Sequence, residues 1–282
     1  MREIDSLQRF IFEHAHIRGE IVHINNTFKT IMSQRNYPPR VKIMLAEAMV
    51  SCLLLTSSIK FEGSLSLQFQ GDKRLSLILV QCDHDLNIRA LAQFEESLTD
   101  EDYDKAFLTG KMMLTINQDA QAQTYQSMVS IESSEMSENL MNYFAQSEQI
   151  TTGVWLAVND DCAAGLLLQL MPSDASIERE QFWEYAVQLG QTVTEEELLT
   201  LDNQTLLYRL YNETELRLFD SRPTQFKCRC TPDKMKQVVR VLGEQDALEL
   251  LKSRKELEVT CDFCNQSYGF DPIDVALIFK ET

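Results

Sequence analysis

Four cysteines in the last fifth of the chain have spacings that suit metal binding. One residue separates Cys228 from Cys230, and two residues separate Cys261 from Cys264. Structural Zn²⁺ takes four ligands in a tetrahedron and favours thiolates, so two segments that each supply a chelating pair can complete its coordination. Because four of the seven cysteines are used in this way, the sequence predicts one zinc ion per chain, held by these four side chains.

The same thiols could also respond to oxidants. A thiolate is nucleophilic toward peroxide or hypochlorite, and each pair holds a second thiol that can resolve an oxidised sulfur. Structural zinc supplies on the order of 10–16 kcal/mol of apparent folding energy at neutral pH, which a domain of roughly 60 residues cannot replace from its own core. Oxidation would therefore unfold the small domain that carries these cysteines. The neighbouring helices would then lose any docking that depends on this domain. A permanent structural zinc site explains the ligands as well and remains open.

The remaining candidate residues give weaker signals. Lys227 and Arg229 flank the first pair, where they are either exposed charges or an offset to the negative charge of a zinc tetrathiolate. We expect the isolated cysteines to be buried side chains without a role in switching: Cys52, Cys82 and Cys162. The scattered histidines have no spacing that requires a metal: His14, His16, His23 and His84.

Composition limits the partners and the compartment. The 282-residue chain is 44% hydrophobic with a formal net charge of −17, which permits a folded core and opposes non-specific binding to nucleic acid or anionic membrane. The apolar stretch 41–59 contains Lys42 and Glu47, which predicts a buried helix rather than a membrane span. The N-terminus lacks the apolar run of a signal peptide. We therefore expect a cytoplasmic protein, in which clustered thiols stay reduced.

The motifs of common enzymes are absent from the sequence. It contains no G-x-S-x-G, no G-x-x-x-x-G-K-[ST] and no G-x-G-x-x-G. The CxxC pair of a thiol oxidoreductase normally opens a helix in a thioredoxin-like unit. Here Cys264 runs into "NQSYGF", which has the pattern of a hairpin. We expect that the protein is not an enzyme.

Residues 1–173 combine strand and helix patterns and predict an N-terminal α+β core domain, with antiparallel sheets packed against helices. A long helix is expected at 40–59 and another at 137–149. A hairpin turn is expected at Gly71-Asp72. The expected strands, several of which alternate polar and apolar residues, are 7–14, 17–25, 64–71, 74–82, 111–119, 124–133, 152–160 and 164–172.

Residues 174–225 predict a metastable helical linker. A helix over 176–190 ends at Gly190, and the capping-box spacing of Thr194 and Glu197 precedes a second helical stretch at 198–213. Such helices cannot bury their apolar stripes alone, so they must dock on a domain or on something else.

Residues 226–282 predict a small C-terminal α+β domain around the zinc site. A helix opens at Thr231-Pro232 and a second spans 244–253. A strand at 256–260 leads into the CxxC turn, and Asp271-Pro272 opens the last helix.

The segments that carry the clustered cysteines resemble those of a known family. "FKCRC" and "VTCDFCNQSYGFD" are similar to the thiol motifs of the heat shock protein 33 family, the redox-regulated holdase chaperones of the cytosol. "KFEGSLSLQFQGDKRLSLILVQC", "YQSMVSIE", "NYFAQSEQITT" and "AGLLLQLMP" resemble family segments in family order, so the resemblance spans nearly the whole chain. Thr151 stands where the family usually has proline, and Ala90 where a glycine is expected. These departures concern local backbone geometry and leave the thiol chemistry intact.

The resemblance implies a stress-activated holdase. The four cysteines of the reduced, inactive protein would hold one zinc ion. Oxidants would form the disulfides Cys228–Cys230 and Cys261–Cys264 and expel the metal. The C-terminal domain and the linker would then unfold and expose surface for unfolding client proteins, and the oxidised form would be a homodimer. We expect client-binding side chains on the linker: Trp183, Tyr185, Leu207 and Tyr211.

A zinc-ribbon nucleic-acid-binding protein is the alternative. Two thiol knuckles permit it, and the region after Phe226 balances its acidic and basic residues closely. The acidity of the whole chain opposes it, because phosphate binding needs positive charge. We therefore expect neither nucleic acid nor membrane as a partner.

Overall fold

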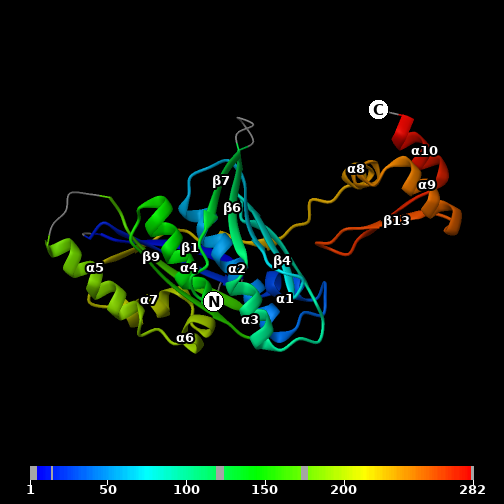
Figure 1. The fold of residues 1–282 in the computed structure, drawn as a ribbon. Coiled ribbons are helices and arrows are strands. Elements are labelled where there is room, and N and C mark those ends of the chain that lie inside the picture. Colours follow the sequence, from blue (N-terminus) through cyan, green and yellow to red (C-terminus); the bar gives the residue numbers. More distant parts are fainter. Residues whose placement is uncertain (1–4, 14, 119–123, 173–176, 281–282) are drawn as a thin grey trace. The chain divides into compact units, whose positions relative to one another are not determined.

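The computed structural model describes residues 5–13, 15–118, 124–172 and 177–280. The chain forms two compact units, Met1–Phe226 and Lys227–Thr282. Each unit has its own hydrophobic core and combines helices with sheets (Figure 1). The predicted α+β class is confirmed, including the small unit that carries the four clustered cysteines.

The first unit contains two sheets, each with six strands in its described part. Sheet 1 has the order β10-β1-β2-β9-β8, with β11 also on β1, and all its pairs are antiparallel. Its strands are β1 (Ser6–Phe12), β2 (Ile17–Ile24), β8 (Thr152–Val158), β9 (Ala163–Leu170), β10 (Leu216–Leu218) and β11 (Arg222–Pro223).

Sheet 2 has the order β12-β5-β4-β3-β6-β7. All its pairs are antiparallel except β12 with β5. The turn predicted at Gly71-Asp72 joins β3 to β4, and these strands pair antiparallel as expected. The strands of sheet 2 are β3 (Gly63–Gln70), β4 (Leu75–Asp83), β5 (Asn87–Phe94), β6 (Lys111–Gln118), β7 (Thr124–Val129) and β12 (Gln225–Phe226).

Helix α2 (Pro39–Ser58) lies in the core of this unit and contacts strands of both sheets. Its first helical residue is Pro39, a position where proline is tolerated because the missing N–H would have no helical partner. Gly165 of β9 permits close packing, since a Cβ there would lie 2.5 Å from Cγ1 of Val50. Within the described ranges α2 is the one helix with the length and composition of a membrane span, but 78% of that apolar window is buried. The prediction of a buried core helix is therefore confirmed.

Three further helical segments complete this part of the unit. Helices α1 (Asn26–Met32) and α3 (Asp100–Leu108) had no counterpart among the expected elements. Helix α4 (Met136–Tyr143) begins as predicted but continues as a π-helical turn, η1 (Phe144–Glu148). The face expected to be apolar is buried: Leu140, Tyr143 and Phe144.

The linker helices cover one face of sheet 1. They are α5 (Ile177–Gly190), α6 (Glu195–Thr200) and α7 (Asn203–Tyr211). Successive residues of a strand point to opposite faces, and the packing follows this rule, because Leu166 and Leu168 contact the linker cluster while Leu167 contacts the α2 cluster. The division of this unit into a core domain, 1–173, and a separate linker, 174–225, stays a prediction.

Two details of the predicted linker are wrong. The expected helix over 198–213 is broken, because Asp202 is extended and its side chain accepts a hydrogen bond from the backbone N–H of Thr205 to start α7. The capping box of Thr194 and Glu197 is present as predicted, at the start of α6. The end of the segment is not helical, since β10, β11 and β12 pair there with β1 and β5.

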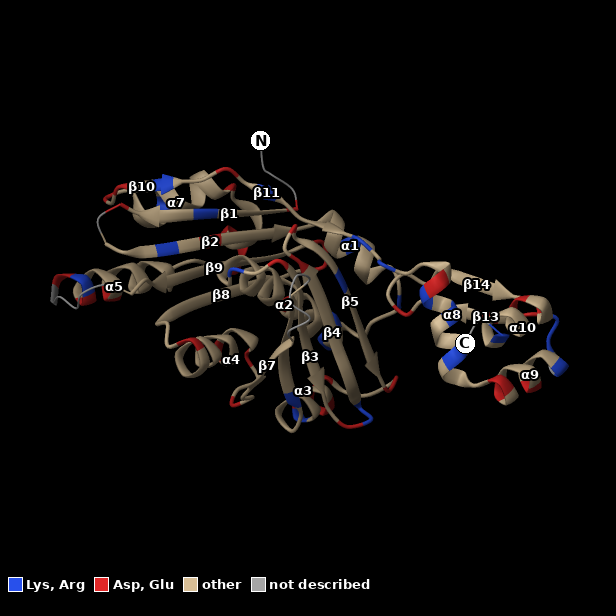
Figure 2. Cartoon of the chain, turned by 90° about the horizontal axis from the view of Figure 1, so that it is seen from above, with Lys and Arg blue, Asp and Glu red and all other residues tan. Residues whose placement is uncertain are grey.

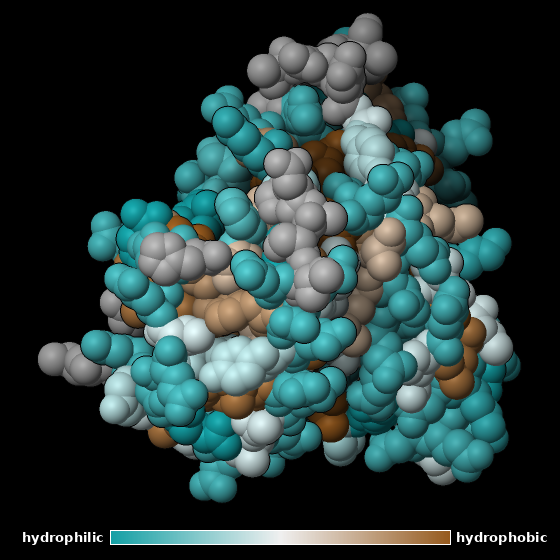
Figure 3. All heavy atoms as spheres, turned by 90° about the vertical axis from the view of Figure 1, so that its left-hand side faces the viewer, coloured by the Kyte–Doolittle hydropathy of each residue, from teal (hydrophilic) through white to brown (hydrophobic). Residues whose placement is uncertain are grey.

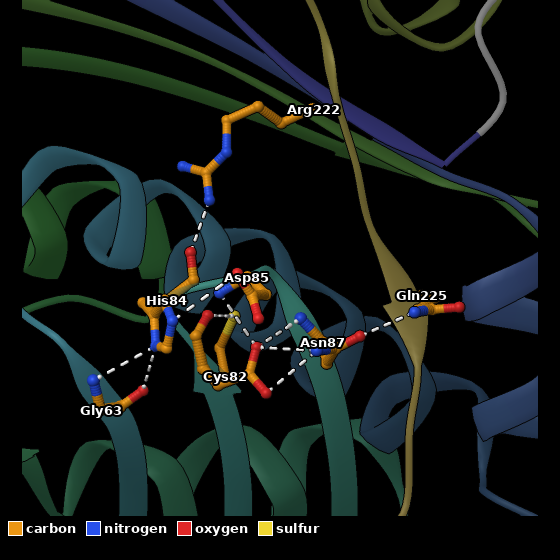
Figure 4. A network of polar contacts seen from close by, with 8 residues as sticks. Gly63, Cys82, His84, Asp85, Asn87, Arg222 and Gln225 are labelled. Atoms are coloured by element: carbon orange, nitrogen blue, oxygen red, sulfur yellow. Dashed lines mark hydrogen bonds and ion pairs between the residues drawn. The ribbon is translucent and has the colours of Figure 1, made fainter. Parts of the chain in front are cut away.

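Residues 222–226, here called the strap, run from sheet 1 to sheet 2 (Figure 4). The guanidinium of Arg222 donates to the carbonyl of His84, and Nε2 of Gln225 donates to Oδ1 of Asn87 at 2.8 Å. The buried hydroxyl of Thr224 donates to the carbonyl of Leu86 at 3.0 Å. The strap is thus fixed to the turn between β4 and β5, immediately before the chain enters the second unit.

The second unit is small and has few buried apolar side chains. Its helices are α8 (Pro232–Leu242), α9 (Glu244–Ser253) and α10 (Pro272–Lys280), and its strands are β13 (Leu257–Thr260) and β14 (Ser267–Phe270). Residues of both charge signs occur along this unit (Figure 2). Its core cluster consists of Val239, Ala247, Leu257, Phe270, Val275 and Ile278.

Candidate metal centre

The first thiol pair lies on the extended segment between β12 and α8. Thr231 ends this segment, and its side chain caps α8 by accepting from the backbone N–H of Lys234. The ammonium of Lys234 reaches back to donate to the carbonyl of Arg229 at 2.8 Å. The position of the helix start therefore fixes the backbone between Cys228 and Cys230.

The second pair lies at the tip of the β13–β14 hairpin. The backbone N–H of Cys261 donates to the carbonyl of Gln266 at 2.9 Å, and the N–H of Asn265 donates to the carbonyl of Cys261 at 2.8 Å. Asn265 has a φ of 54°, in the left-handed region that asparagine tolerates better than most residues. These bonds close a tight knuckle, which confirms the hairpin predicted for this segment.

The four sulfur atoms converge on one point. All four Sγ atoms lie within 4.8 Å of one another. Two of the separations join the two knuckles, at 3.6 Å between Cys228 and Cys261 and 3.5 Å between Cys230 and Cys264. With Zn–S bonds of about 2.3 Å, the sulfurs of a tetrahedral site lie about 3.8 Å apart. The cluster therefore fits a tetrathiolate metal ion, and it is the one such group of ligands found in the described part of the chain.

Mutual contacts control the protonation of these thiols. Burial raises the pKa of Cys228, but hydrogen bonds from the backbone N–H of Cys230 and from the neighbouring thiols lower it to about 7. Burial raises the pKa of Cys261 and Cys264, and a hydrogen bond with Cys228 raises both further. Without a cation the cluster thus favours a thiolate on Cys228 over one on Cys261 or Cys264, whereas a bound divalent cation favours deprotonation of its thiol ligands.

Tyr268 is a polar neighbour of the cluster that sequence reasoning did not single out. Its hydroxyl donates to Sγ of Cys230 at 3.2 Å. The strand pattern of "SYGF" could have pointed to Tyr268. This residue lies in the strand that follows the CxxC knuckle, where a side chain can point toward the knuckle. Of the two basic residues that flank the first pair, Lys227 is exposed and Arg229 is half-buried.

The isolated cysteines and the histidines lie outside the cluster. The described histidines contribute no ligand to it, and His14 lies outside the described residues. The expectation of burial is confirmed for the other three cysteines: Cys52, Cys82 and Cys162.

The side chains predicted to bind clients are covered to different extents. Leu207 and Tyr211, both on α7, are buried, while Trp183 and Tyr185 on α5 are partly exposed. Tyr211 packs edge to face against Phe12 of sheet 1, with ring centroids 5.0 Å apart. Figure 3, which faces the side of the molecule that carries α5, shows a mostly hydrophilic surface with smaller apolar areas. Their role in client binding stays a prediction.

The fold and the cysteine cluster together define a chaperone family. The model of the Hsp33 protein family matches residues 5–271. The chain therefore belongs to the Hsp33 family, which is named for a chaperone and not for an enzyme. This confirms the resemblance seen in the sequence.

Individual relatives match over almost the full length. The 33 kDa chaperonin of Nitrosococcus oceani is 36% identical over 281 residues, which cover 100% of this chain and 96% of that protein. The 33 kDa chaperonin of Pseudomonas syringae pv. tomato is 38% identical, covering 98% of this chain and 94% of its own length. The crystal structure of the 33 kDa chaperonin of Thermotoga maritima has a TM-score of 0.83 at 20% identity and covers 98% of both chains, which supports the fold.

Proposed function

We propose that this protein is a redox-regulated holdase, inactive while its four-cysteine centre holds zinc and active once the centre is oxidised. The observation that carries the proposal is the convergence of four thiols within 4.8 Å in a unit that has only a small core. Membership of a chaperone family supplies the second support. Its partners are unfolded or partly unfolded proteins, whose aggregation it prevents.

The switch uses the chemistry of the thiolates. Bound zinc would hold all four sulfurs in the deprotonated, nucleophilic form. One thiolate of a pair attacks peroxide and breaks its O–O bond, which leaves a sulfenic acid and hydroxide. The second thiolate attacks the sulfenic sulfur and expels another hydroxide. Each pair gives two electrons to one peroxide, and the products are the neighbour disulfides Cys228–Cys230 and Cys261–Cys264.

Loss of the ligands destabilises the second unit. The metal site joins the segment before α8 to the β13–β14 hairpin, and among the described residues the core cluster of this unit has six buried apolar side chains. Several large apolar side chains of this unit stay exposed even when it is folded, among them Val241 at 88% and Ile273 at 70%. A unit of this size depends on its metal for stability, so its unfolding follows oxidation.

Unfolding then spreads along the chain to the linker. A single residue separates Cys228 from Phe226, the last residue of the strap. Release of the strap frees β10 and α7, which are connected to it in sequence. The apolar face of sheet 1 under the linker helices would become accessible to clients: Phe10, Phe12, Ile21, Leu166 and Leu168.

Zinc as the metal, dimerisation of the oxidised form and a cytoplasmic location complete the proposal. A four-thiolate site suits zinc best among the common divalent ions of the cell. The homodimer rests on membership of the Hsp33 family. Acidity and burial of the apolar helix α2 agree with a protein that works in an aqueous compartment.

The test compares reduced, zinc-loaded protein with peroxide-oxidised protein at mildly elevated temperature. The oxidised protein is expected to suppress the light scattering of a thermally unfolding test protein, and the reduced protein is not. Cys162→Ser is the matched control, because this cysteine is buried and outside the cluster. Equal suppression by the reduced form would rule out the switch.

A further inference from the structure

Each sulfur of the cluster has its own hydrogen-bond donors. Backbone N–H groups donate to three of the four sulfurs: Cys230 to Cys228, Phe263 and Cys264 to Cys261, and Gln266 to Cys264. Such bonds are expected at metal-binding knuckles, because they stabilise the negative charge on the thiolates.

Cys230 has a side-chain donor. The hydroxyl of Tyr268 donates to its sulfur at 3.2 Å. The amide oxygen of Gln266 lies 3.9 Å from the same sulfur. That oxygen can accept from a thiol but has nothing to donate to a thiolate. The hydroxyl of Tyr268 is therefore placed to stabilise charge on Cys230.

The position of the Tyr268 hydroxyl is fixed by packing. Tyr268 lies opposite Val259 in the β13–β14 hairpin, and its ring packs against the core of the second unit. Phe270, two residues on, points to the same side and is buried in that core. A tyrosine has two side-chain torsions, so a packed ring leaves its hydroxyl little freedom beyond rotation of the O–H bond.

We propose that Tyr268 is the positioning residue that sets the reactivity of Cys230, and through it the rate at which the centre responds to oxidants. This inference rests on the proposed redox switch. An O–H donor draws charge from the thiolate, which makes it a weaker nucleophile toward electrophiles. The same bond stabilises the thiolate as a metal ligand, as polar neighbours of metal ligands generally do.

The variant that isolates this bond is Tyr268→Phe, which keeps the packed ring and removes the hydroxyl. Ser267→Ala is the matched control, because it removes a hydroxyl from the adjacent residue, whose partner is Thr260 at 2.9 Å and not a sulfur. Both variants are made in the full chain and loaded with zinc.

The first readout needs no oxidant. Zinc-loaded protein is treated with iodoacetamide, and digestion after Arg229 and Lys234 places Cys230 alone on a short peptide, while Cys261 and Cys264 stay together on another. Tyr268→Phe is expected to speed alkylation of Cys230 roughly 10-fold relative to the Cys261/Cys264 peptide. Uniform acceleration of all the cysteines would indicate a loosened fold and would overturn the inference.

The second readout is zinc release, followed with a colorimetric chelator in peroxide. Tyr268→Phe is expected to release zinc roughly 10-fold faster than wild type and Ser267→Ala at the wild-type rate. Equal rates for all three proteins, or equal acceleration by both variants, overturn the inference. If Tyr268→Phe loses zinc on purification and Ser267→Ala does not, that supports it. Wild-type protein that kept its zinc in peroxide would refute the proposed switch, and the alkylation ratio would still decide the role of Tyr268.

Discussion

The hydroxyl of Tyr211 donates to the backbone carbonyl of Ala186 at 3.1 Å, in a buried bond that joins α7 to α5. The same ring meets Phe12 of sheet 1 edge to face. One side chain thus connects two linker helices to each other and to the sheet beneath them. The proposed activation requires this connection to break.

Tyr211→Phe is expected to weaken the docking of the linker helices on sheet 1 without changing the metal centre. It removes one buried hydrogen bond, which costs about 1 kcal/mol of stability and leaves the ring in place. The reduced variant should show weak suppression of aggregation where wild type shows none, with the same zinc content. Tyr208→Phe is the control, since Tyr208 is 71% exposed on the same helix. Identical basal activity in all three proteins would argue against this role for Tyr211.

Thr224→Val tests the strap. The hydroxyl of Thr224 donates to the carbonyl of Leu86 from a buried position, so its loss costs about 1–3 kcal/mol. We expect faster hydrogen exchange at 222–226 in the reduced protein, and activation at lower peroxide concentration. Thr109→Val is a control, because that hydroxyl caps the end of α3, remote in sequence from the strap. Unchanged exchange at the strap in Thr224→Val would contradict the prediction.

Glu20 gives the first unit a dependence on pH. Burial raises the pKa of Glu20 to about 7, although the nearby Arg9 and Arg18 oppose the shift. An unfolded glutamate titrates near about 4.3, so between that pH and about 7 the native state binds more protons than the unfolded state. The free energy of unfolding therefore falls as pH rises through this window.

Glu20→Gln is expected to remove this decrease in the free energy of unfolding with rising pH. Between pH 5 and pH 8 the wild type should lose up to roughly 3 kcal/mol relative to the variant. Urea denaturation at the two pH values measures this difference. Parallel pH profiles of the two proteins would show that Glu20 titrates normally in the folded state.

Chelation of the metal under reducing conditions is expected to unfold the second unit and to leave the core helix α2 folded. Within the described ranges its core cluster has six buried residues, and loss of structural zinc removes on the order of 10 kcal/mol. Hydrogen exchange should become fast in α8, α9 and α10 while α2 stays protected. Protection of α8 after chelation would mean that the core suffices without the ion.

Much of the fold follows from periodicity in the sequence. Strands β1 to β4 and β6 to β9 alternate polar and apolar residues or are continuously apolar, and helix α2 is a long apolar segment, so their positions agree with prediction. The short strands β10, β11 and β12 lie in the expected helical linker and were not predicted. Helix α1 was missed because seven residues carry too little periodic signal, and α3 because its nine residues present only a short buried face, Tyr103, Ala106 and Phe107. The break at Asp202 was missed because a cap within a helical pattern competes with helix continuation, and tertiary packing decided between them.

The cysteine cluster was predictable from the sequence, but its surroundings were not. Spacing alone identified Cys228, Cys230, Cys261 and Cys264, because chelating pairs are rare by chance. Tyr268 and the strap could not be found in this way. Their partners lie 38 and 138 residues away in sequence, and such contacts depend on strand register and on the fold as a whole.

The account is tested most directly by counting zinc and mapping disulfides in the same sample, before and after peroxide. It predicts one zinc and four free clustered thiols per reduced chain. After oxidation it predicts no zinc, with Cys228 bonded to Cys230 and Cys261 bonded to Cys264. Reduced protein without metal, or oxidised protein that retains its zinc with those thiols free, would contradict it.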